Sequence, residues 1–340
     1  MKPKHVLPVP FSLSPYGYTA GTAYEHILKI AGASEKAGAY SPSNLIERQC
    51  SIHAPVEFTS FENDQPQSGH YLRTLQSLQH NLADRVCSIM NDAETLAIIG
   101  GDHSISVGTG LGLSRCFDLS QIGLIWIDAH ADSNTPETSL SKSLTGCPVA
   151  INAGLGPKQL TQPFCGNFIR HVAQIGLRDI DEMEMGNVHQ MKSTIFSILD
   201  VVELGMKTVI DRALRSLSHC KYIWLSIDID SLDSVYFQPG ETDVPCPGGL
   251  SPRELLYLVN SVRRSGKLKI FELTQVNDLG KQTPVMVLSS RILEMALGLG
   301  QFRYGGAASG SEAIASQSFS IPAVGAQSPQ FSHSPIRAFT

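Results

Sequence analysis

Short apolar runs rich in β-branched residues alternate along the chain with longer segments in which apolar residues recur at helical spacing. Several short runs are almost continuously hydrophobic, for example IGLIWI at 122–127 and YIWLSI at 222–227. Such runs are typical of strands covered on both faces, as in a parallel sheet. Strands are predicted at 5–11, 51–58, 95–99, 122–127, 172–177, 194–199, 222–227 and 269–276.

Helical patterns lie between these runs, near residues 22–33, 69–91, 104–115, 203–216, 251–264 and 285–299. Strands that alternate with helices form βαβ units, in which the helices cover both faces of one sheet. We therefore expect an α/β fold, namely a three-layer α/β/α sandwich around a mostly parallel sheet of about eight strands.

The chain changes character after Tyr304. From Gly305 to Thr340 it is rich in Gly, Ala, Ser, Gln and Pro, and Glu312 and Arg337 are the only charged residues. A segment of this composition cannot bury a core. The sequence therefore predicts one domain over 1–304 and a disordered tail over 305–340, with an extended arm on a neighbouring subunit as the alternative.

Charge and hydropathy narrow the class of protein. The net charge is -5, the pI is near 6.1 and no basic block is present, which argues against a nucleic-acid partner. No window approaches the length of apolar sequence that a membrane span needs, and the first residues read as a strand and not as a signal peptide. The seven cysteines are scattered and none forms a C-x-x-C pair, so they indicate reduced thiols of a cytoplasmic protein, without a disulfide frame or a zinc site.

Three polar segments follow predicted strands directly. They are GGDHS at 100–104, DAHAD at 128–132 and SIDID at 226–230. The carboxyl ends of the strands are where open α/β sheets bind their ligands. Each segment alone has a structural explanation, since GGDHS can be a tight turn that caps the next helix and the other two can be solvated loops. The three together, each at a strand end, favour a functional site.

The composition of these segments indicates a metal centre. Residues two apart in an extended segment point to the same side, so Asp128, His130 and Asp132 can converge, as can Asp228 and Asp230. Adding His103 gives two imidazoles, four carboxylates and no thiolate, a donor set that suits Mn²⁺ better than zinc or copper. Carboxylates so crowded repel each other unless cations neutralise them, and two ions roughly 3.5–4 Å apart can do so through bridging carboxylates.

The same motifs resemble a known family. GGDHS, WIDAHAD and SIDIDSLD, followed by GGLSPREL, are similar to the signatures of the ureohydrolases, which comprise arginases, agmatinases and formimidoylglutamases. The resemblance runs from VLPVPF to about Gly300 and implies one α/β domain with a dimanganese site at the edge of an eight-stranded parallel sheet. By motif, it implies that one Mn²⁺ is bound by His103 and Asp132, the other by His130 and Asp230, and that Asp128 and Asp228 bridge both.

Within this family, NTPETS at 134–139 resembles the arginase loop that holds the α-carboxylate and α-amino groups of the substrate. Asn134 and Ser141 match two of its polar contacts, Asp181 matches a residue that holds the α-amino group, and Glu184 lies where a further carboxylate contact is expected. The resemblance thus implies hydrolysis of L-arginine to L-ornithine and urea. A hydroxide that bridges the metals would attack the guanidinium carbon, and Asp132 would shuttle its proton.

Two positions depart from the arginase pattern. Thr145 stands where arginases have a histidine that shuttles protons to the leaving amine, and a hydroxyl does not titrate near neutrality. Gln275 stands where the family usually has a glutamate that pairs with the guanidinium group, so the charge-assisted pair is absent. Glu272 lies three residues away, on the opposite face of a regular strand, and is a poor substitute.

Several functions are compatible with these departures. Arginase-type hydrolysis of a small amino acid is favoured, with slow or specialised turnover. A related ureohydrolase acting on another guanidino, ureido or formimidoyl amino acid is the alternative, as is a metal-binding pseudoenzyme without turnover. Phosphoryl transfer is disfavoured because the chain has no Walker-type loop. The resemblance further implies a homotrimer or hexamer.

Overall fold

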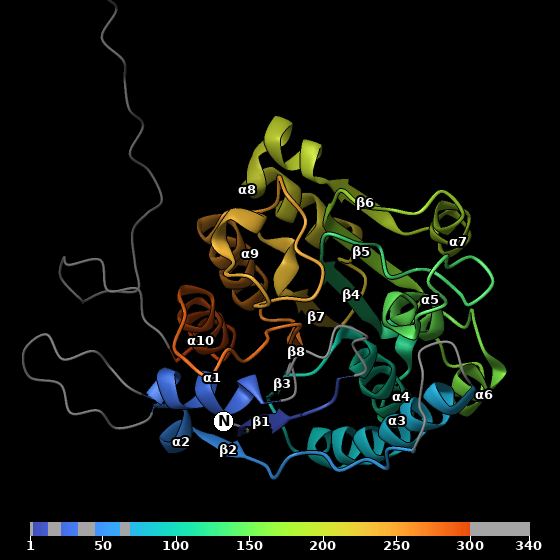
Figure 1. Ribbon diagram of the computed structural model, residues 1–340, viewed down its shortest axis with the longest axis horizontal. Helices are drawn as coiled ribbons and strands as arrows, with labels where there is room; N and C mark the ends of the chain where they lie inside the picture. Colours follow the sequence, from blue (N-terminus) through green and yellow to red (C-terminus); the bar gives the residue numbers. More distant parts are fainter. Residues whose placement is uncertain (1–2, 13–21, 33–44, 62–68, 300–340) are drawn as a thin grey trace, which may run out of the picture. The chain divides into compact units, whose positions relative to one another are not determined.

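A parallel sheet of eight strands organises residues 3–12, 22–32, 45–61 and 69–299, the part of the chain that the computed structural model describes (Figure 1). The strands lie in the order β2-β1-β3-β8-β7-β4-β5-β6, and every pairing is parallel. Their bounds are β1 Lys4–Pro8, β2 Cys50–Ile52, β3 Thr95–Ile99, β4 Ile122–Ile127, β5 His171–Leu177, β6 Thr194–Ser197, β7 Tyr222–Asp228 and β8 Leu268–Thr274. The predicted parallel α/β sheet is confirmed.

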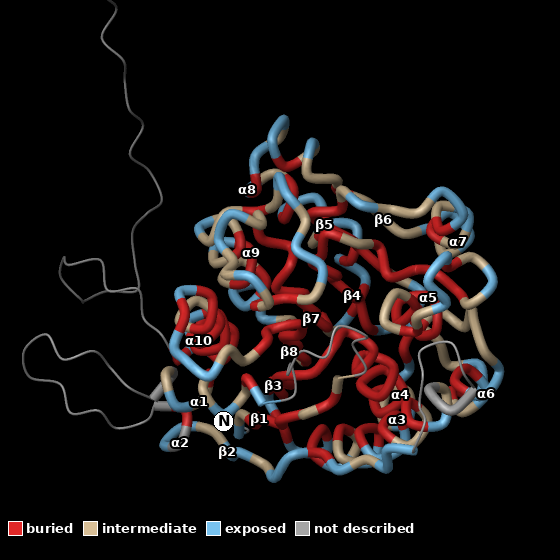
Figure 2. Tube along the Cα trace, viewed as in Figure 1, coloured by how far each residue is buried: buried red, intermediate tan, exposed pale blue. Residues whose placement is uncertain are grey.

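Helices cover both faces of this sheet and bury two apolar layers against it (Figure 2). One layer lies under α1, α2, α8, α9 and α10, and the other under α3, α4, α5 and α6. The helices are α1 Ala23–Gly32, α2 Leu45–Gln49, α3 Gly69–Met90, α4 Ser106–Cys116, α5 Pro148–Asn152, α6 Lys158–Thr161, α7 Glu184–Met191, α8 Ile198–Ser216, α9 Pro252–Arg264 and α10 Pro284–Ala296. None of these helices combines the length and the apolar character that crossing a membrane requires.

Most differences from the predicted elements lie at their ends. The strand predicted over 194–199 ends at Ser197, because this residue caps α8: its hydroxyl accepts the Asp200 N–H and the Asp200 carboxylate accepts the Ser197 N–H. Helices α5 and α6 are too short to show a helical period. The tail predicted over 305–340 lies outside the described residues.

The strand order brings the three polar segments together. Strands β3, β8, β7 and β4 are consecutive neighbours, and their carboxyl ends meet at one edge of the sheet. After β3 the chain turns at Gly100 and Gly101, both at positive φ, and a Cβ on Gly101 would lie 2.6 Å from the carbonyl oxygen of Phe11. Only glycine fits this turn, which delivers His103 to the same edge as the segments after β4 and β7.

Candidate metal centre

Short turns, and not extended strands, make the two aspartate-rich segments converge. Asp128 Oδ1 accepts the N–H of His130 at 2.8 Å, and Asp228 Oδ1 accepts the N–H of Asp230 at 2.8 Å. Asp132 lies beyond the first turn with a left-handed φ of 47°. The convergence of these side chains was therefore predicted from the sequence, but the predicted extended conformation was wrong. The carboxylates of Asp128 and Asp228 instead bend the chain into turns.

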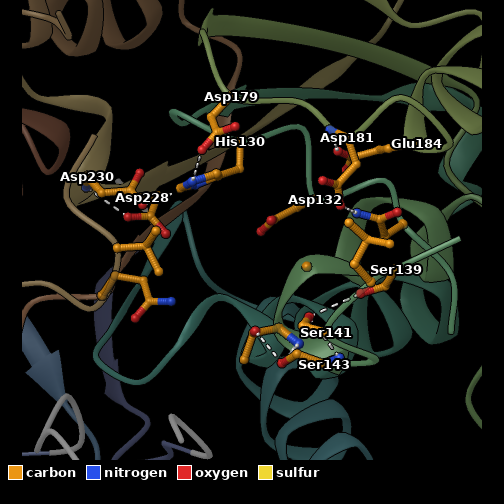
Figure 3. A pocket seen from close by; sticks show the side chains of 16 residues that line it. His130, Asp132, Ser139, Ser141, Ser143, Asp179, Asp181, Glu184, Asp228 and Asp230 are labelled. Atoms are coloured by element: carbon orange, nitrogen blue, oxygen red, sulfur yellow. Dashed lines mark hydrogen bonds and ion pairs between the residues drawn. The ribbon is translucent and has the colours of Figure 1, made fainter. Parts of the chain in front are cut away.

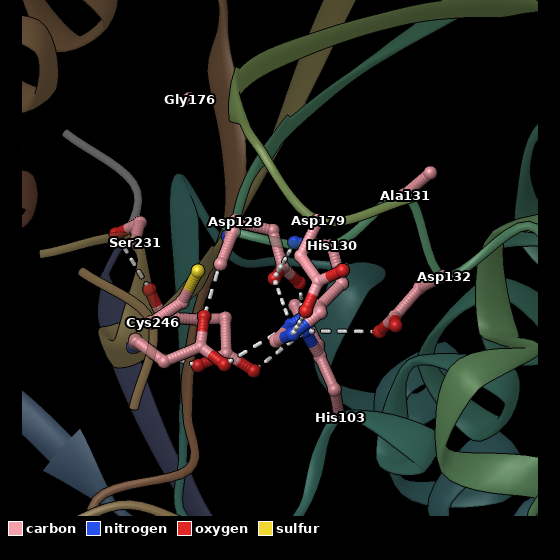
Figure 4. A network of polar contacts seen from close by, with 12 residues as sticks. His103, Asp128, His130, Ala131, Asp132, Gly176, Asp179, Ser231 and Cys246 are labelled. Carbon is pink, nitrogen blue, oxygen red and sulfur yellow. Dashed lines mark hydrogen bonds and ion pairs between the residues drawn. The ribbon is translucent and has the colours of Figure 1, made fainter. Parts of the chain in front are cut away.

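The six predicted metal ligands form one cluster, of which Figure 4 labels His103, Asp128, His130 and Asp132, and Figure 3 labels Asp228 and Asp230. His103 Nδ1 lies 3.0 Å from Asp128 Oδ2, 3.2 Å from Asp228 Oδ2 and 3.5 Å from Asp132 Oδ2. His130 Nδ1 lies 3.3 Å from Asp128 Oδ1 and 3.2 Å from Asp230 Oδ2. Asp128 thus presents one oxygen to each histidine, which is the arrangement that a bridging carboxylate requires.

Burial gives this cluster an unfavourable charge distribution when no cation is near. Burial, followed by the negative charge of neighbouring carboxylates, raises the pKa of Asp132, Asp228 and Asp230. Burial alone would lower the pKa of His103, but its hydrogen bonds to Asp128 and Asp228 outweigh this effect and raise that pKa well above its usual value. The cluster therefore retains protons that a divalent cation would displace.

A hydrogen-bonded relay behind the cluster orients His103. The Ser226 hydroxyl lies 2.9 Å from His103 Nε2 and donates its hydrogen to Glu272 Oε2 at 2.8 Å. Because a hydroxyl has one hydrogen, Ser226 accepts from the His103 Nε2–H, and in the neutral ring the lone pair of Nδ1 points at the carboxylates. Ser106 and Thr109 also donate to the buried Glu272 carboxylate, which does not line the cavity that Gln275 lines.

Trp126 contacts two of the predicted ligands, and Arg178 holds the surrounding backbone. The Trp126 ring stacks on His103 with the ring centroids 3.7 Å apart, and its N–H donates to Asp128 Oδ2 at 3.0 Å. This tryptophan is fully buried, so it belongs to the core and also contacts the site. The Arg178 guanidinium donates to the carbonyl oxygens of Asp230, Leu232 and others nearby, so it ties the end of β5 to the turn after β7.

A cavity of about 330 Å³ opens above the cluster (Figure 3). Every predicted substrate or catalytic position lines it, and Ser139, Leu140, Ser143, Asp179 and Val244 line it as well, although the sequence did not single them out. The lining residues are His130, Asp132, Asn134, Ser139, Leu140, Ser141, Ser143, Thr145, Gly146, Asp179, Asp181, Glu184, Asp228, Asp230, Val244 and Gln275.

One side of the cavity gathers polar groups in hydrogen-bonded pairs. Asn134 Nδ2 donates to Asp181 Oδ2 at 3.1 Å, and the hydroxyls of Ser139 and Ser141 lie 3.1 Å apart. Glu184 accepts the N–H of Ser133 at 2.6 Å, which lowers its pKa, but burial has the larger effect and raises the pKa of Glu184 to about 7. This side can hold both an ammonium and a carboxylate group.

Gln275 and Thr145, the two positions that depart from the arginase pattern, also line the cavity. Gln275 has a left-handed φ of 62° and is 9% exposed. Its buried Oε1 has no hydrogen-bond partner within the described ranges, so an acceptor is available to a ligand in the cavity. The Thr145 hydroxyl lies 2.7 Å from that of Ser143. No histidine other than His130 lines this cavity among the described residues.

We expect the metal-free protein to lose stability as the pH rises above about 4, the pKa of an unfolded aspartate. The pKa values of His103, His130, Asp132 and Asp230 are raised by folding, so the folded state binds more protons than the unfolded state through the neutral range. A cation replaces these protons, and its stabilisation should therefore grow with pH. At 100 times its dissociation constant Mn²⁺ contributes roughly 2.7 kcal/mol.

The measurement is the melting temperature with and without Mn²⁺ between pH 6 and pH 8. The matched control is Asp179→Asn, because Asp179 also approaches His130 but its side chain is 66% exposed. An increment that is the same at every pH would show that cation binding is not linked to these groups.

The sequence of this chain is similar to those of arginases, and its fold is similar to that of a solved arginase structure. The model of the Arginase family matches residues 14–297. An arginase of Schizosaccharomyces pombe is 37% identical over 187 residues, which are 53% of this chain and 56% of that relative, so the chain spans little more than half of its length. Arginase-1 of Sus scrofa is 30% identical over 286 residues, 81% of this chain and 85% of the relative. The crystal structure of Entamoeba histolytica arginase in complex with L-ornithine superposes with a TM-score of 0.74 at 25% identity, covering 88% of this chain and 98% of that structure.

Proposed function

The chain belongs to the arginase family, and from this we propose that it hydrolyses the guanidinium group of L-arginine to give L-ornithine and urea. The observation that supports this most is one cavity that joins a six-ligand carboxylate and histidine cluster to a polar side suited to an α-amino acid. The cytoplasmic location and the trimeric or hexameric assembly expected from the sequence are part of the same proposal.

The donor set of the cluster fits two divalent cations. One group of donors is His103, Asp128 and Asp132, the other is Asp128, His130 and Asp230, and in each group the donor atoms lie within 4.8 Å of one another. Each group would hold one Mn²⁺, with Asp128 belonging to both groups and Asp228 available as a further ligand beside His103 and Asp230. When bound, the two ions supply the nucleophile at neutral pH by lowering the pKa of water.

The residues of the chain would bind the substrate at its α-carbon end. Asp181 and Glu184 provide carboxylates for the α-ammonium group. Asn134 Nδ2 uses one hydrogen for Asp181 and keeps a second for the α-carboxylate, beside the hydroxyl of Ser141. The guanidinium group would then point toward Asp132, which lines the cavity and can take up the proton released by the attacking water. Asp132 would return that proton to the leaving nitrogen.

The guanidinium end lacks two functional groups that would speed the reaction. Gln275 can accept one hydrogen bond through Oε1 but carries no charge to pair with a guanidinium group. Thr145 can orient a water molecule but cannot protonate the leaving amine near neutral pH. We therefore propose slow turnover of L-arginine.

We expect Gln275→Glu to raise kcat/KM for L-arginine about tenfold. A hydrogen bond to a charged group contributes roughly 1.5–3 kcal/mol, compared with about 1 kcal/mol for a neutral one. Steady-state kinetics with Mn²⁺ measures the change, and Gln275→Met, which removes the acceptor and adds no charge, is the control. A fall in arginine turnover in Gln275→Glu would favour a substrate whose reacting end is neutral.

The proposed function is tested by loading the protein with Mn²⁺ and measuring urea release from L-arginine. Agmatine, a ureido amino acid and a formimidoyl amino acid are assayed in parallel by loss of substrate. Urea from arginine and none from agmatine supports the proposal, because agmatine lacks the α-carboxylate that the polar side would bind. Turnover of only the ureido or formimidoyl compound would replace arginine as the substrate within the same family.

A binding protein without turnover is the second candidate function. The replacements at 145 and 275 favour it, because both match family positions that act at the reacting end, while Asn134, Asp181 and Glu184 keep the polar groups for an amino acid. Calorimetry with L-ornithine separates the two: ornithine binding by a Mn²⁺-loaded protein that consumes none of the four compounds would support the binding protein.

A further inference from the structure

A second group of metal-binding side chains lies at the opposite edge of the sheet from the cavity. His171 is the first residue of β5, and His219 and Cys220 lie in the turn between α8 and β7 (Figure 1). Strands β5 and β7 both pair with β4, so their amino ends lie two strands apart at this edge. One nitrogen of each imidazole and the Cys220 Sγ all lie within 4.8 Å of one another.

The backbone holds these three residues in place. His171 pairs with Gly123 in the sheet, and Cys220 N–H donates to Leu217 O at 3.0 Å, at the end of α8. Lys267 Nζ donates to the carbonyl oxygens of Ser218 and Cys220 at 2.7 and 2.8 Å, which fixes the turn against the beginning of β8. The backbone of the three residues is thus held in place, and binding an ion would require only that the exposed His219 ring turn.

The three donor groups are free to bind a ligand. The His171 and His219 rings contact edge to face, with their centroids 4.2 Å apart and an interplanar angle of 82°. Within the described part of the chain, no hydrogen bond or ion pair is made by the side chain of His171, His219 or Cys220. Burial, and then the proximity of His219, lowers the pKa of His171, which favours the neutral ring with a free lone pair.

We propose that His171, His219 and Cys220 bind a divalent transition metal ion such as Zn²⁺, at a site separate from the carboxylate cluster. Two imidazoles and a thiolate form a tetrahedral zinc site with one open position, and a set without carboxylates does not suit Mn²⁺. His219 is exposed, so its ring can turn toward Cys220 and close the donor separations to the roughly 3.5 Å that zinc bond lengths require.

Such an ion would act on the structure of this edge. It would join β5 to the turn between α8 and β7, far along the strands from the cavity. We therefore expect it to raise the melting temperature and to leave urea release unchanged. The buried Cys220 would lose its proton to the ion, since binding requires the thiolate.

Co²⁺ added to the full-length protein, stripped of metal and then saturated with Mn²⁺, tests the site through its absorption. A thiolate bound to Co²⁺ gives a sulfur-to-metal charge-transfer band in the near ultraviolet. The carboxylate cluster has no sulfur donor, so Co²⁺ that enters it produces no such band. We expect the band in the unmodified protein and in the control Cys165→Ser, whose cysteine is exposed and outside the group.

Variants of Cys220 and His219 test whether these residues bind the ion. Cys220→Ser should abolish the band, and His219→Gln should weaken Co²⁺ binding at least about tenfold. Because Cys220 is buried and its replacement can disturb folding, His219→Gln at the surface is the second variant, and Zn²⁺ should raise its melting temperature less than that of the unmodified protein. Absence of the band in the unmodified protein, or its persistence in Cys220→Ser, would overturn the proposal.

Discussion

Asp128→Asn should lower urea release from L-arginine by at least about 10³-fold and reduce the cation content of the purified protein. Asp128 is the residue whose two oxygens face both histidines, at 3.0 Å from His103 and 3.3 Å from His130. An amide offers one weak oxygen donor in place of two carboxylate oxygens and no charge. Both cations should therefore be held poorly, so the kinetic loss and the loss of metal should occur together.

Asparagine keeps most of the local structure at this position. Its Oδ1 can still accept the N–H of His130, so the turn after β4 is retained. Metal analysis, urea release and circular dichroism are measured on Asp128→Asn and on the control Asp179→Asn, whose carboxylate is exposed and lies 3.9 Å from His130 Nε2. Full activity in a folded Asp128→Asn protein would show that the reaction does not depend on this cluster.

Thr145→His should raise kcat for L-arginine by roughly 10²-fold, within the range of about 10²–10⁴ that a general acid contributes. Thr145 lines the cavity and follows the polar loop that starts at Asn134. A histidine there can protonate the leaving amine, an interaction made only in the transition state, so KM should change little.

The pH dependence of the activity distinguishes general-acid catalysis by the new histidine from an effect of its packing in the cavity. An added general acid titrates with a pKa near 6.5, so activity of Thr145→His should gain a descending limb at high pH. Thr145→Gln, which is of similar size and does not titrate, is the control and should stay at the original rate. A rise in kcat that is equal in both variants would attribute the effect to packing or water orientation.

The proximity of the three motif segments could be predicted from the sequence because parallel strands place their carboxyl ends at one edge of the sheet. Once β3, β4 and β7 are placed, their carboxyl ends must share an edge, so the segments that carry His103, Asp128 and Asp228 lie close together, and the turns after the strands bring these side chains into contact. The strand ends were less predictable. At Ser197 a side-chain cap outweighs the β-propensity of TIFSIL, and a left-handed residue at Gln275 follows the end of β8 at Thr274.

Contacts between distant segments were not predictable. The sequence assigned no role to Ser226 and indicated only that Glu272 is a poor substitute for Gln275, but the two side chains are hydrogen-bonded behind His103. His171 and Cys220 are 49 positions apart and fit no zinc spacing, so the cysteine pattern alone excluded the site that the fold brings together. The sequence pattern of a single segment does not indicate contacts between distant residues, because these contacts depend on the order of the strands in the sheet.

The place of β8 in the sheet has a consequence for how the protein is made. Among the described strands this is the last in the sequence, yet it lies between β3 and β7 and separates β1, β2 and β3 from β4 to β7. During synthesis, the β3 edge and the β7 edge cannot be joined until residues 268–274 leave the ribosome. A nascent chain that ends before β8 should therefore hold His103 apart from Asp128 and Asp228, and should acquire cation affinity only when this strand inserts.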